Sequence, residues 1–124
     1  MKNVIQTDAA PKEAGPYSQA VEANGFVFTS GVIGINPYTG ELEGYDVEQA
    51  ERAMLNLENL LIAAGTSIEN VVKTTVYIKD MADFPIINDV YMKHFKEPYP
   101  ARICVEVSSL PNGALVEIEA VALK

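Results

Sequence analysis

Cysteine, histidine and tryptophan are almost absent from this sequence. It contains one cysteine, Cys104, one histidine, His94, and no tryptophan. A single cysteine excludes an internal disulfide framework, and too few cysteines and histidines are present for a zinc site. We therefore expect chemistry that needs no metal, in a reducing, cytoplasmic setting.

Basic residues and long apolar runs are also scarce. The chain has 9 lysines and arginines against 17 acidic residues, a net charge of −8, whereas proteins that grip phosphate backbones usually present a basic stripe. The longest apolar run, residues 60–64, is much shorter than the roughly 20 residues of a membrane span. Residues 1–6 do not read as a signal peptide. We expect neither a nucleic-acid partner nor a membrane segment.

The remaining composition is that of a folded domain. A chain of 124 residues with 48% hydrophobic residues can bury one core and is too short for two. No linker, repeat or low-complexity tract interrupts it. The sequence predicts a single domain over residues 1–124.

Turn residues and apolar spacing divide the chain into strands and two helices. Asn24-Gly25 predicts a tight hairpin turn. A helix is expected to begin at Asp46, with Gln49 completing a capping box, and to end at Gly65. Asp83 is expected to cap a second helix. The predicted strands cover residues 20–23, 26–35, 71–79, 102–107 and 115–123. This order predicts a mixed α+β fold with both helices on one face of the sheet.

Strand alternation assigns side chains to the two faces of this sheet. Ile103 and Val105 are expected under the helices, whereas Arg102 and Cys104 are expected on the opposite face. Glu117 is expected on that second face as well. Because part of this face is too apolar to be left in water, we expect a homo-oligomer to cover it.

Arg102 and Glu117 are the strongest candidates for chemistry. The Arg102 guanidinium suits a carboxylate ligand held by two parallel hydrogen bonds; the alternative is a structural ion pair with Glu106 or Glu119. Glu117 suits orienting or deprotonating a water. The alternative is that Glu117 is an exposed carboxylate without a chemical role. Glu119, two residues further on, is a second candidate for the same role.

The other reactive side chains offer less. Cys104 lies between two apolar residues and is expected to be an inert, buried thiol. His94 falls late in a helix, so no partner for a cysteine nucleophile is evident. The residues alone therefore indicate a small acidic oligomer with an arginine suited to holding an anion.

Six segments, in order along the chain, carry a resemblance to a known family. They are residues 15–20 (GPYSQA), 29–31 (TSG), 36–41 (NPYTGE), 72–80 (VKTTVYIKD), 100–107 (PARICVEV) and 116–120 (VEIEA). Together they closely resemble the reactive intermediate deaminases, the Rid or YjgF family, almost from end to end.

The resemblance implies a fold, an assembly and an activity. The fold is a chorismate-mutase-like α+β domain with a mixed six-stranded sheet and two helices on one face. The assembly is a homotrimer with active sites between subunits. The activity is hydrolysis of reactive 2-imino acids and their enamines, such as 2-iminobutanoate and 2-iminopropanoate, to 2-oxo acids and ammonia. No cofactor is implied.

The family's functional positions transfer residue by residue. The resemblance implies that Arg102 binds the substrate carboxylate and that Glu117 handles the water. The sequence departs from the family pattern at two places. Ile103 stands where many members carry a small residue, and we expect its side chain to face the helices. The loop 96–99 is shorter than in some members. The further positions implied for substrate binding are Tyr17, Ser30, Gly31, Asn88 and Cys104.

Two other kinds of function remain open at this point. The same pocket would serve a protein that binds or senses 2-oxo acids without turnover. A ribonuclease or translation inhibitor, also attributed to some members of the family, is disfavoured by the net charge of −8.

Overall fold

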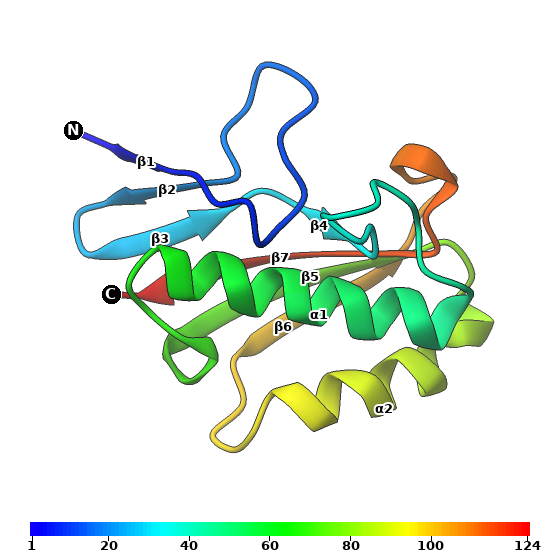
Figure 1. Cartoon of the computed structure of the whole chain (residues 1–124). Coiled ribbons are helices and arrows are strands. Elements are labelled where there is room, and N and C mark those ends of the chain that lie inside the picture. Colours follow the sequence, from blue (N-terminus) through cyan, green and yellow to red (C-terminus); the bar gives the residue numbers. More distant parts are fainter.

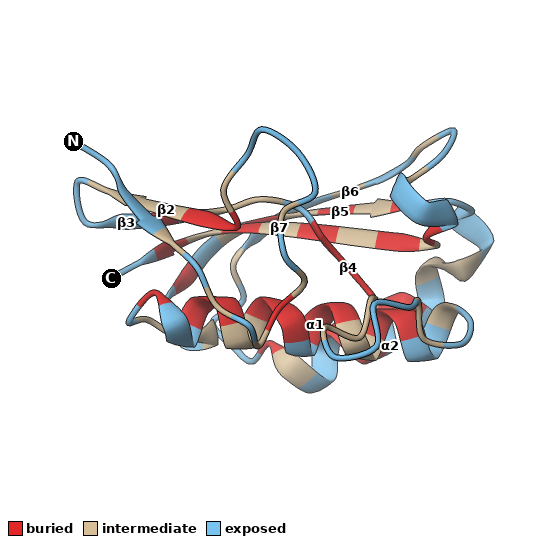
Figure 2. Ribbon diagram, turned by 45° about the horizontal axis from the view of Figure 1, so that its top comes forward, coloured by how far each residue is buried: buried red, intermediate tan, exposed pale blue.

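The sheet has the strand order β1-β2-β3-β7-β5-β6, with β4 also paired to β7. In the computed structural model, which describes residues 1–124, two α-helices cover one face of this sheet and leave the other face open (Figures 1 and 2). The expected mixed α+β fold is confirmed, but the sheet has seven strands instead of six. The strands are β1 Asn3–Ile5, β2 Ala20–Ala23, β3 Phe26–Thr29, β4 Val32–Ile33, β5 Val71–Ile78, β6 Ala101–Glu106 and β7 Val116–Leu123; the helices are α1 Asp46–Ala63 and α2 Phe84–His94, and short 3-10 turns occur at Ile68–Asn70 (η1), Met81–Asp83 (η2) and Pro111–Gly113 (η3).

The predicted strand over residues 26–35 is broken by a bulge. Phe28 pairs with Val121 and Val32 pairs with Ile118 of β7. The chain therefore advances four residues from Phe28 to Val32 while β7 advances three, which leaves one extra residue at the break. Such an extra residue bends a strand and redirects its side chains. The hydroxyl of Thr29 accepts a hydrogen bond from the Ala120 amide at 3.0 Å and replaces a main-chain partner at the break. The predicted hairpin turn is confirmed, because Asn24 and Gly25 both have positive φ.

Helix α1 begins at Asp46, as predicted, and ends at Ala63 with Ala64 as its C-cap. Gly65 follows with a φ of +84°, in agreement with its predicted role at the helix end. The predicted capping partner is wrong: Glu48, not Gln49, accepts a hydrogen bond from the Tyr45 amide. Gln49 instead lies buried, and its side chain accepts from the amide of Leu115 at 2.9 Å. It therefore joins the helix to the start of β7.

Helix α2 packs against α1 and the sheet through Ile87, Val90 and Tyr91, which are buried. Asp83 precedes the helix as predicted but forms no capping hydrogen bond; Asp80 caps the preceding turn, accepting from the Ala82 amide. His94 ends the helix, and its Nε2 lies 2.9 Å from Glu51 of α1. His94 thus ties the two helices together.

Strand β4 approaches α1 more closely than a side chain would allow. Gly34, just after β4, is buried, and a Cβ there would lie 2.6 Å from Cα of Gln49. Asn56 of α1 is fully buried and donates to the carbonyl oxygens of Ile33 and Ile35, at 3.0 and 2.8 Å. These contacts fix the segment that follows the bulge against the helix.

The predicted faces of β7 are confirmed, but those of β6 are reversed. Arg102 pairs with Thr74 and Cys104 with Val76, and both partners are buried beneath the helices. Ile103 is 50% exposed on the open face. An alternating pattern defines two sets of side chains but does not say which set faces the core. In β6 the charged set lies beside α2.

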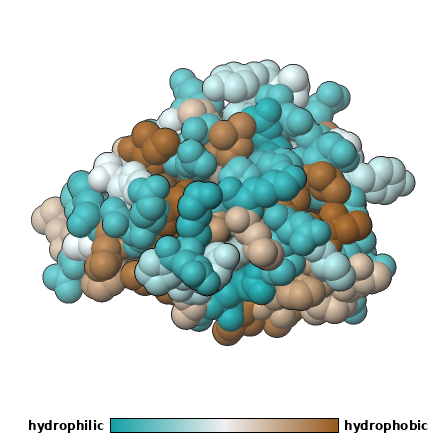
Figure 3. Space-filling model, turned by 90° about the horizontal axis from the view of Figure 1, so that it is seen from below, coloured by the Kyte–Doolittle hydropathy of each residue, from teal (hydrophilic) through white to brown (hydrophobic).

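Apolar side chains remain exposed on the open face of the sheet. They include Phe26 and Phe28 of β3 and Ile103 and Val105 of β6. By contrast, the view from below is largely hydrophilic, with separate small apolar patches (Figure 3). Neither helix is both long enough and apolar enough to cross a membrane.

Candidate functional site

The residues expected in one site, Cys104 excepted, line two separate pockets. The first, here called the glutamate pocket, is a cavity of about 170 Å³ whose lining includes Tyr17, Ser30, Gly31 and Glu117. The second, here called the arginine pocket, is a more open hollow of about 420 Å³. It is lined by Asn88, Tyr91, Met92, Tyr99, Pro100 and Arg102.

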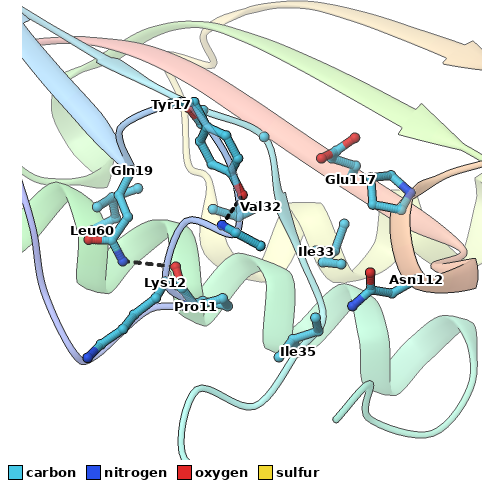
Figure 4. Close-up of a pocket in the computed structure, with 14 residues that line it drawn as sticks. Pro11, Lys12, Tyr17, Gln19, Val32, Ile33, Ile35, Leu60, Asn112 and Glu117 are labelled. Carbon is cyan, nitrogen blue, oxygen red and sulfur yellow. Dashed lines mark hydrogen bonds between the residues drawn. The ribbon is translucent and has the colours of Figure 1, made fainter. Parts of the chain in front are cut away.

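Glu117 contributes the only acidic side chain that lines the glutamate pocket. It belongs to β7 and pairs with Ile33 of β4, so the bulge and the glutamate meet at the same point. Figure 4 shows its carboxylate across the cavity from the Tyr17 ring. Partial burial raises the pKa of Glu117, and the nearby charge of Glu119 raises it further. A carboxylate with a raised pKa is a better proton acceptor than an exposed one.

Gly31 allows the Glu117 side chain to lie against the main chain of the bulge. A Cβ on Gly31 would be 2.5 Å from Oε2 of Glu117 and 2.7 Å from its carboxyl carbon. The neighbouring Ser30 hydroxyl donates to the Ser18 carbonyl at 2.6 Å. Ser30 therefore holds the adjacent loop.

Tyr17 stands at the rim of the glutamate pocket on the loop that joins β1 and β2. Its side chain is 51% exposed, and its hydroxyl accepts a hydrogen bond from the Ala14 amide at 3.2 Å. The loop is held by Gln19, which is buried and lines the same pocket. The Gln19 side chain accepts from the Thr7 amide and donates to the carbonyls of Thr7 and Pro11, at 2.8, 3.0 and 2.9 Å.

Part of the lining of the glutamate pocket is apolar. It includes Ile33, Ile35, Leu60, Pro11 and Pro111. Figure 4 shows the two isoleucines below Glu117. The lining also includes the cationic side chain of Lys12. This combination of one carboxylate, one ammonium group, further polar groups and apolar side chains suits a small polar organic molecule with a short apolar side chain.

Arg102 lies in the arginine pocket without a carboxylate partner. Its Nη1 donates to Oδ1 of Asn88 at 2.8 Å, and its guanidinium lies over the rings of Tyr91 and Phe84. The alternative of a structural ion pair with Glu106 or Glu119 is not observed. Glu106 accepts from the Met81 amide instead, and Glu119 pairs with Thr75 on the open side of the sheet. The guanidinium therefore retains donors for an anionic ligand.

Cys104 follows Arg102 by two residues on the same face of β6 and packs against the core. Partial burial raises the pKa of its thiol, and the charge of Arg102 opposes this effect only in part. A thiol with a raised pKa is a poor nucleophile. The expectation of an inert thiol agrees with this environment.

Cys104→Ala should therefore keep most of the activity proposed below. The cavity left by the sulfur should lower the free energy of unfolding by about 1 kcal/mol. Chemical denaturation and a steady-state assay measure the two effects. Complete loss of activity in a variant that folds and assembles like the parent would show that the thiol takes part in the chemistry.

Arg102 and Glu117 do not lie on the same face of the sheet, contrary to the expectation from the sequence. Strand β5 separates their strands. On β5, Thr74 pairs with Arg102 on the helix side, whereas Tyr77 pairs with Glu117 on the open side. Within one chain, the structure groups Tyr17, Ser30 and Gly31 with Glu117, and groups Asn88 and Cys104 with Arg102.

Two residues that shape these pockets were not found from the sequence. Gln19 lay within a motif, but nothing in its spacing indicated that its amide would hold the loop. Tyr91 lies in the second predicted helix, and the apolar periodicity that predicts a helix carries no information about a guanidinium on a distant strand.

The fold and the two pockets define a small α+β protein that has a cavity with one carboxylate and, in a separate pocket, an arginine without an acidic partner. The profile of the Endoribonuclease L-PSP family matches residues 7–124. The chain therefore belongs to this family, and its resemblance to the Rid/YjgF proteins is confirmed.

Named relatives align over the whole chain. A RutC family protein of Pyrococcus horikoshii is 51% identical over 125 residues, covering 100% of this chain and 99% of the relative. The 2-iminobutanoate/2-iminopropanoate deaminase of Homo sapiens is 44% identical, with 100% and 91% covered. The crystal structure of E. coli TdcF with bound serine has a TM-score of 0.93 at 40% identity, covering 98% of each chain.

Proposed function

We propose that this protein hydrolyses small 2-imino acids, such as 2-iminobutanoate and 2-iminopropanoate, to 2-oxo acids and ammonia. The observation that carries the proposal is the pair of complementary pockets, one with an unpaired guanidinium and the other with a carboxylate of raised pKa. A relative named for this activity, 44% identical over the full chain, supports it. The serine bound to E. coli TdcF is also a small molecule with a carboxylate beside a nitrogen-bearing carbon.

We further propose that the active site forms between subunits of a homotrimer. One chain carries Arg102 and Glu117 on opposite faces of its sheet, so a second copy must supply the missing half. The exposed apolar residues of the open face, including Phe28 and Ile103, give the copies a surface to bury. Closed rings are the common outcome when one face meets a different face of the next copy.

The two side chains have distinct roles in the proposed reaction. Arg102 binds the substrate carboxylate through parallel hydrogen bonds and so fixes the position of the imine carbon. Glu117 of the neighbouring copy accepts a proton from a water molecule as the water oxygen bonds to that carbon. Starting from the protonated imine, this gives a neutral carbinolamine, whose nitrogen then takes the proton held by Glu117. As the carbon–nitrogen bond breaks, the hydroxyl proton passes back to the Glu117 carboxylate, the carbonyl of the 2-oxo acid forms, and ammonia leaves.

A coupled assay tests this proposal. Threonine dehydratase and threonine generate 2-iminobutanoate in place, semicarbazide traps the free imine, and the release of 2-oxobutanoate is followed. The protein should speed this release and reduce trapping. Binding of 2-oxobutanoate without any acceleration would instead identify a sensor. Cleavage of RNA, or RNA binding that weakens steeply with salt, would support the activity in the family's description.

Mixing two inactive variants tests the shared site. Arg102→Ala and Glu117→Gln chains should each be nearly inactive, but random co-assembly should restore about a quarter of the sites, since each site takes one half from each of two copies. The measurement is activity after co-refolding, with mixed assemblies verified by native mass spectrometry. As a control, Arg102→Ala chains mixed with the double variant should recover nothing. No recovery in verified mixed assemblies would contradict sites between subunits.

A further inference from the structure

Arg102 is an exposed side chain on a strand at the edge of the sheet. A long side chain in such a place normally samples many rotamers, and an anchor for a carboxylate needs one orientation. The contacts around its guanidinium are therefore informative. They come from one face of α2, on which Phe84, Asn88 and Tyr91 recur at four- and three-residue spacing.

The guanidinium carbon of Arg102 lies 4.7 Å from the centroid of the Tyr91 ring and 5.6 Å from that of Phe84. Both separations are within the range of a cation–π contact. Besides this stacking, the guanidinium donates the hydrogen bond to Asn88 described above. A planar guanidinium on an aromatic face keeps its edge donors free for a carboxylate.

Tyr91 itself is held from two further directions. Its hydroxyl lies 2.9 Å from the hydroxyl of Thr74, which is fully buried, and its ring stacks on Phe95 with centroids 4.4 Å apart. The Tyr91 side chain is buried, and burial raises the pKa of its hydroxyl. The hydroxyl stays protonated, so the guanidinium meets a neutral aromatic face on a rigid support.

We propose that Tyr91 is a positioning residue, whose ring holds the Arg102 guanidinium in the orientation that binds the substrate carboxylate. The proposal deepens the proposed function and rests on it for the identity of the ligand. It also stands on geometry that does not depend on turnover, namely the position of the guanidinium above the ring. The two parts can therefore be tested separately.

The first test needs no substrate. The chain has only two arginines, Arg52 and Arg102. Arg52 is paired with Glu43 at 2.9 Å, whereas the cation–π contacts are made by Arg102. In a ¹H–¹⁵N spectrum of the arginine side chains, the Arg102 signal should be shifted upfield by the Tyr91 ring. Arg102→Lys assigns it, and the Arg52 signal serves as the internal reference. An Arg102 signal at the random-coil position in the unaltered protein would overturn the proposal.

The second test compares three variants by kinetics. Tyr91→Leu removes the ring and should raise KM for the imine and the Kd for 2-oxobutanoate by about 2- to 30-fold, as expected for loss of one cation–π contact. The kcat should change little, because the carboxylate is bound equally in the ground and transition states. Tyr91→Phe keeps the ring and should retain both the upfield shift and the KM. Val27→Ala truncates a fully buried side chain on β3, which two other strands separate from the strand of Arg102, and is the control for general loosening of the core.

The outcomes separate the two proposals. If Tyr91→Leu leaves KM and Kd unchanged, or if Val27→Ala raises them equally, Tyr91 has no specific role and this inference is wrong. If the Arg102 signal is shifted but the unaltered protein neither hydrolyses imines nor binds 2-oxobutanoate, the proposed function fails while the arrangement around Arg102 stands. A shifted signal together with a KM effect confined to Tyr91→Leu supports both.

Discussion

Glu117→Gln should slow imine hydrolysis by about 10²- to 10⁴-fold, the usual loss when a general base is removed. Glutamine keeps the shape of the side chain and its place beside Gly31 but cannot accept a proton. Binding of 2-oxobutanoate should survive and even tighten, because a product carboxylate would no longer meet a second negative charge. Calorimetric titration and the coupled assay on the same folded variant measure the two effects. Hydrolysis at the parent rate would show that the water is activated by another group.

The pH dependence gives an independent check on the same residue. Burial, and then the charge of Glu119, raises the pKa of Glu117, and only the ionised form acts as a base. The kcat/KM should therefore fall, as pH decreases, at a higher pH than for an ordinary glutamate. Glu119→Gln removes the neighbouring negative charge, so the fall of kcat/KM at acidic pH should move to lower pH while activity is retained. If the acidic fall of kcat/KM stays at the same pH in Glu119→Gln, a group other than Glu117 is responsible for it.

The raised pKa also has a consequence for stability. A carboxyl group whose pKa is higher in the folded chain than in the unfolded chain stabilises the fold at low pH, and this contribution is lost as pH rises through the folded pKa. At neutral pH the ionised Glu117 therefore destabilises the folded state. Denaturation of Glu117→Gln near pH 7 should show a free energy of unfolding no lower than that of the parent.

Arg102→Lys should weaken both 2-oxobutanoate binding and imine hydrolysis, and by similar factors. Lysine keeps the positive charge but loses the planar fork and the stacking on Tyr91. A hydrogen bond between charged groups contributes about 1.5–3 kcal/mol. Loss of one of two such bonds should thus reduce kcat/KM by roughly 10- to 150-fold. The measurements are titration with 2-oxobutanoate and steady-state kinetics on the same preparation.

The effect of Arg102→Lys differs in kind from that of Glu117→Gln. The first should reduce ligand binding, whereas the second should spare binding and reduce turnover. Normal binding and turnover in Arg102→Lys would mean that the carboxylate anchor is misassigned. The main chemical argument for a deaminase would then be lost with it.

Local signals in the sequence predicted the elements well. Asn24-Gly25 and Gly65 adopt the positive φ that their turn and helix end require, because these conformations depend on the residues themselves. The capping partner was wrong by one residue, since Glu48 and Gln49 are both able to cap and tertiary contacts with Leu115 decide between them. Strand β1 was missed because three residues offer too little pattern.

The sequence grouped the candidate residues into one set and did not indicate the two pockets into which the structure divides them. Alternation in β6 gave the correct partition of Arg102 and Cys104 from Ile103, yet assigned the wrong set to the core. The open face carries exposed apolar side chains, so hydrophobicity alone does not distinguish it from the covered one. The break in β3 was missed because Ser30-Gly31 lies within a run that otherwise reads as a strand, and only pairing with β7 exposes the extra residue.

The contact between Gly31 and Glu117 makes these two positions dependent on each other during evolution. Any side chain at position 31 would begin 2.5 Å from Oε2 of the glutamate, so it would be tolerated only if the carboxylate moved or became shorter. A substitution at one position thus changes which residues are acceptable at the other, and their effects should not add. The absence of a side chain at Gly31 therefore determines where the Glu117 carboxylate can lie.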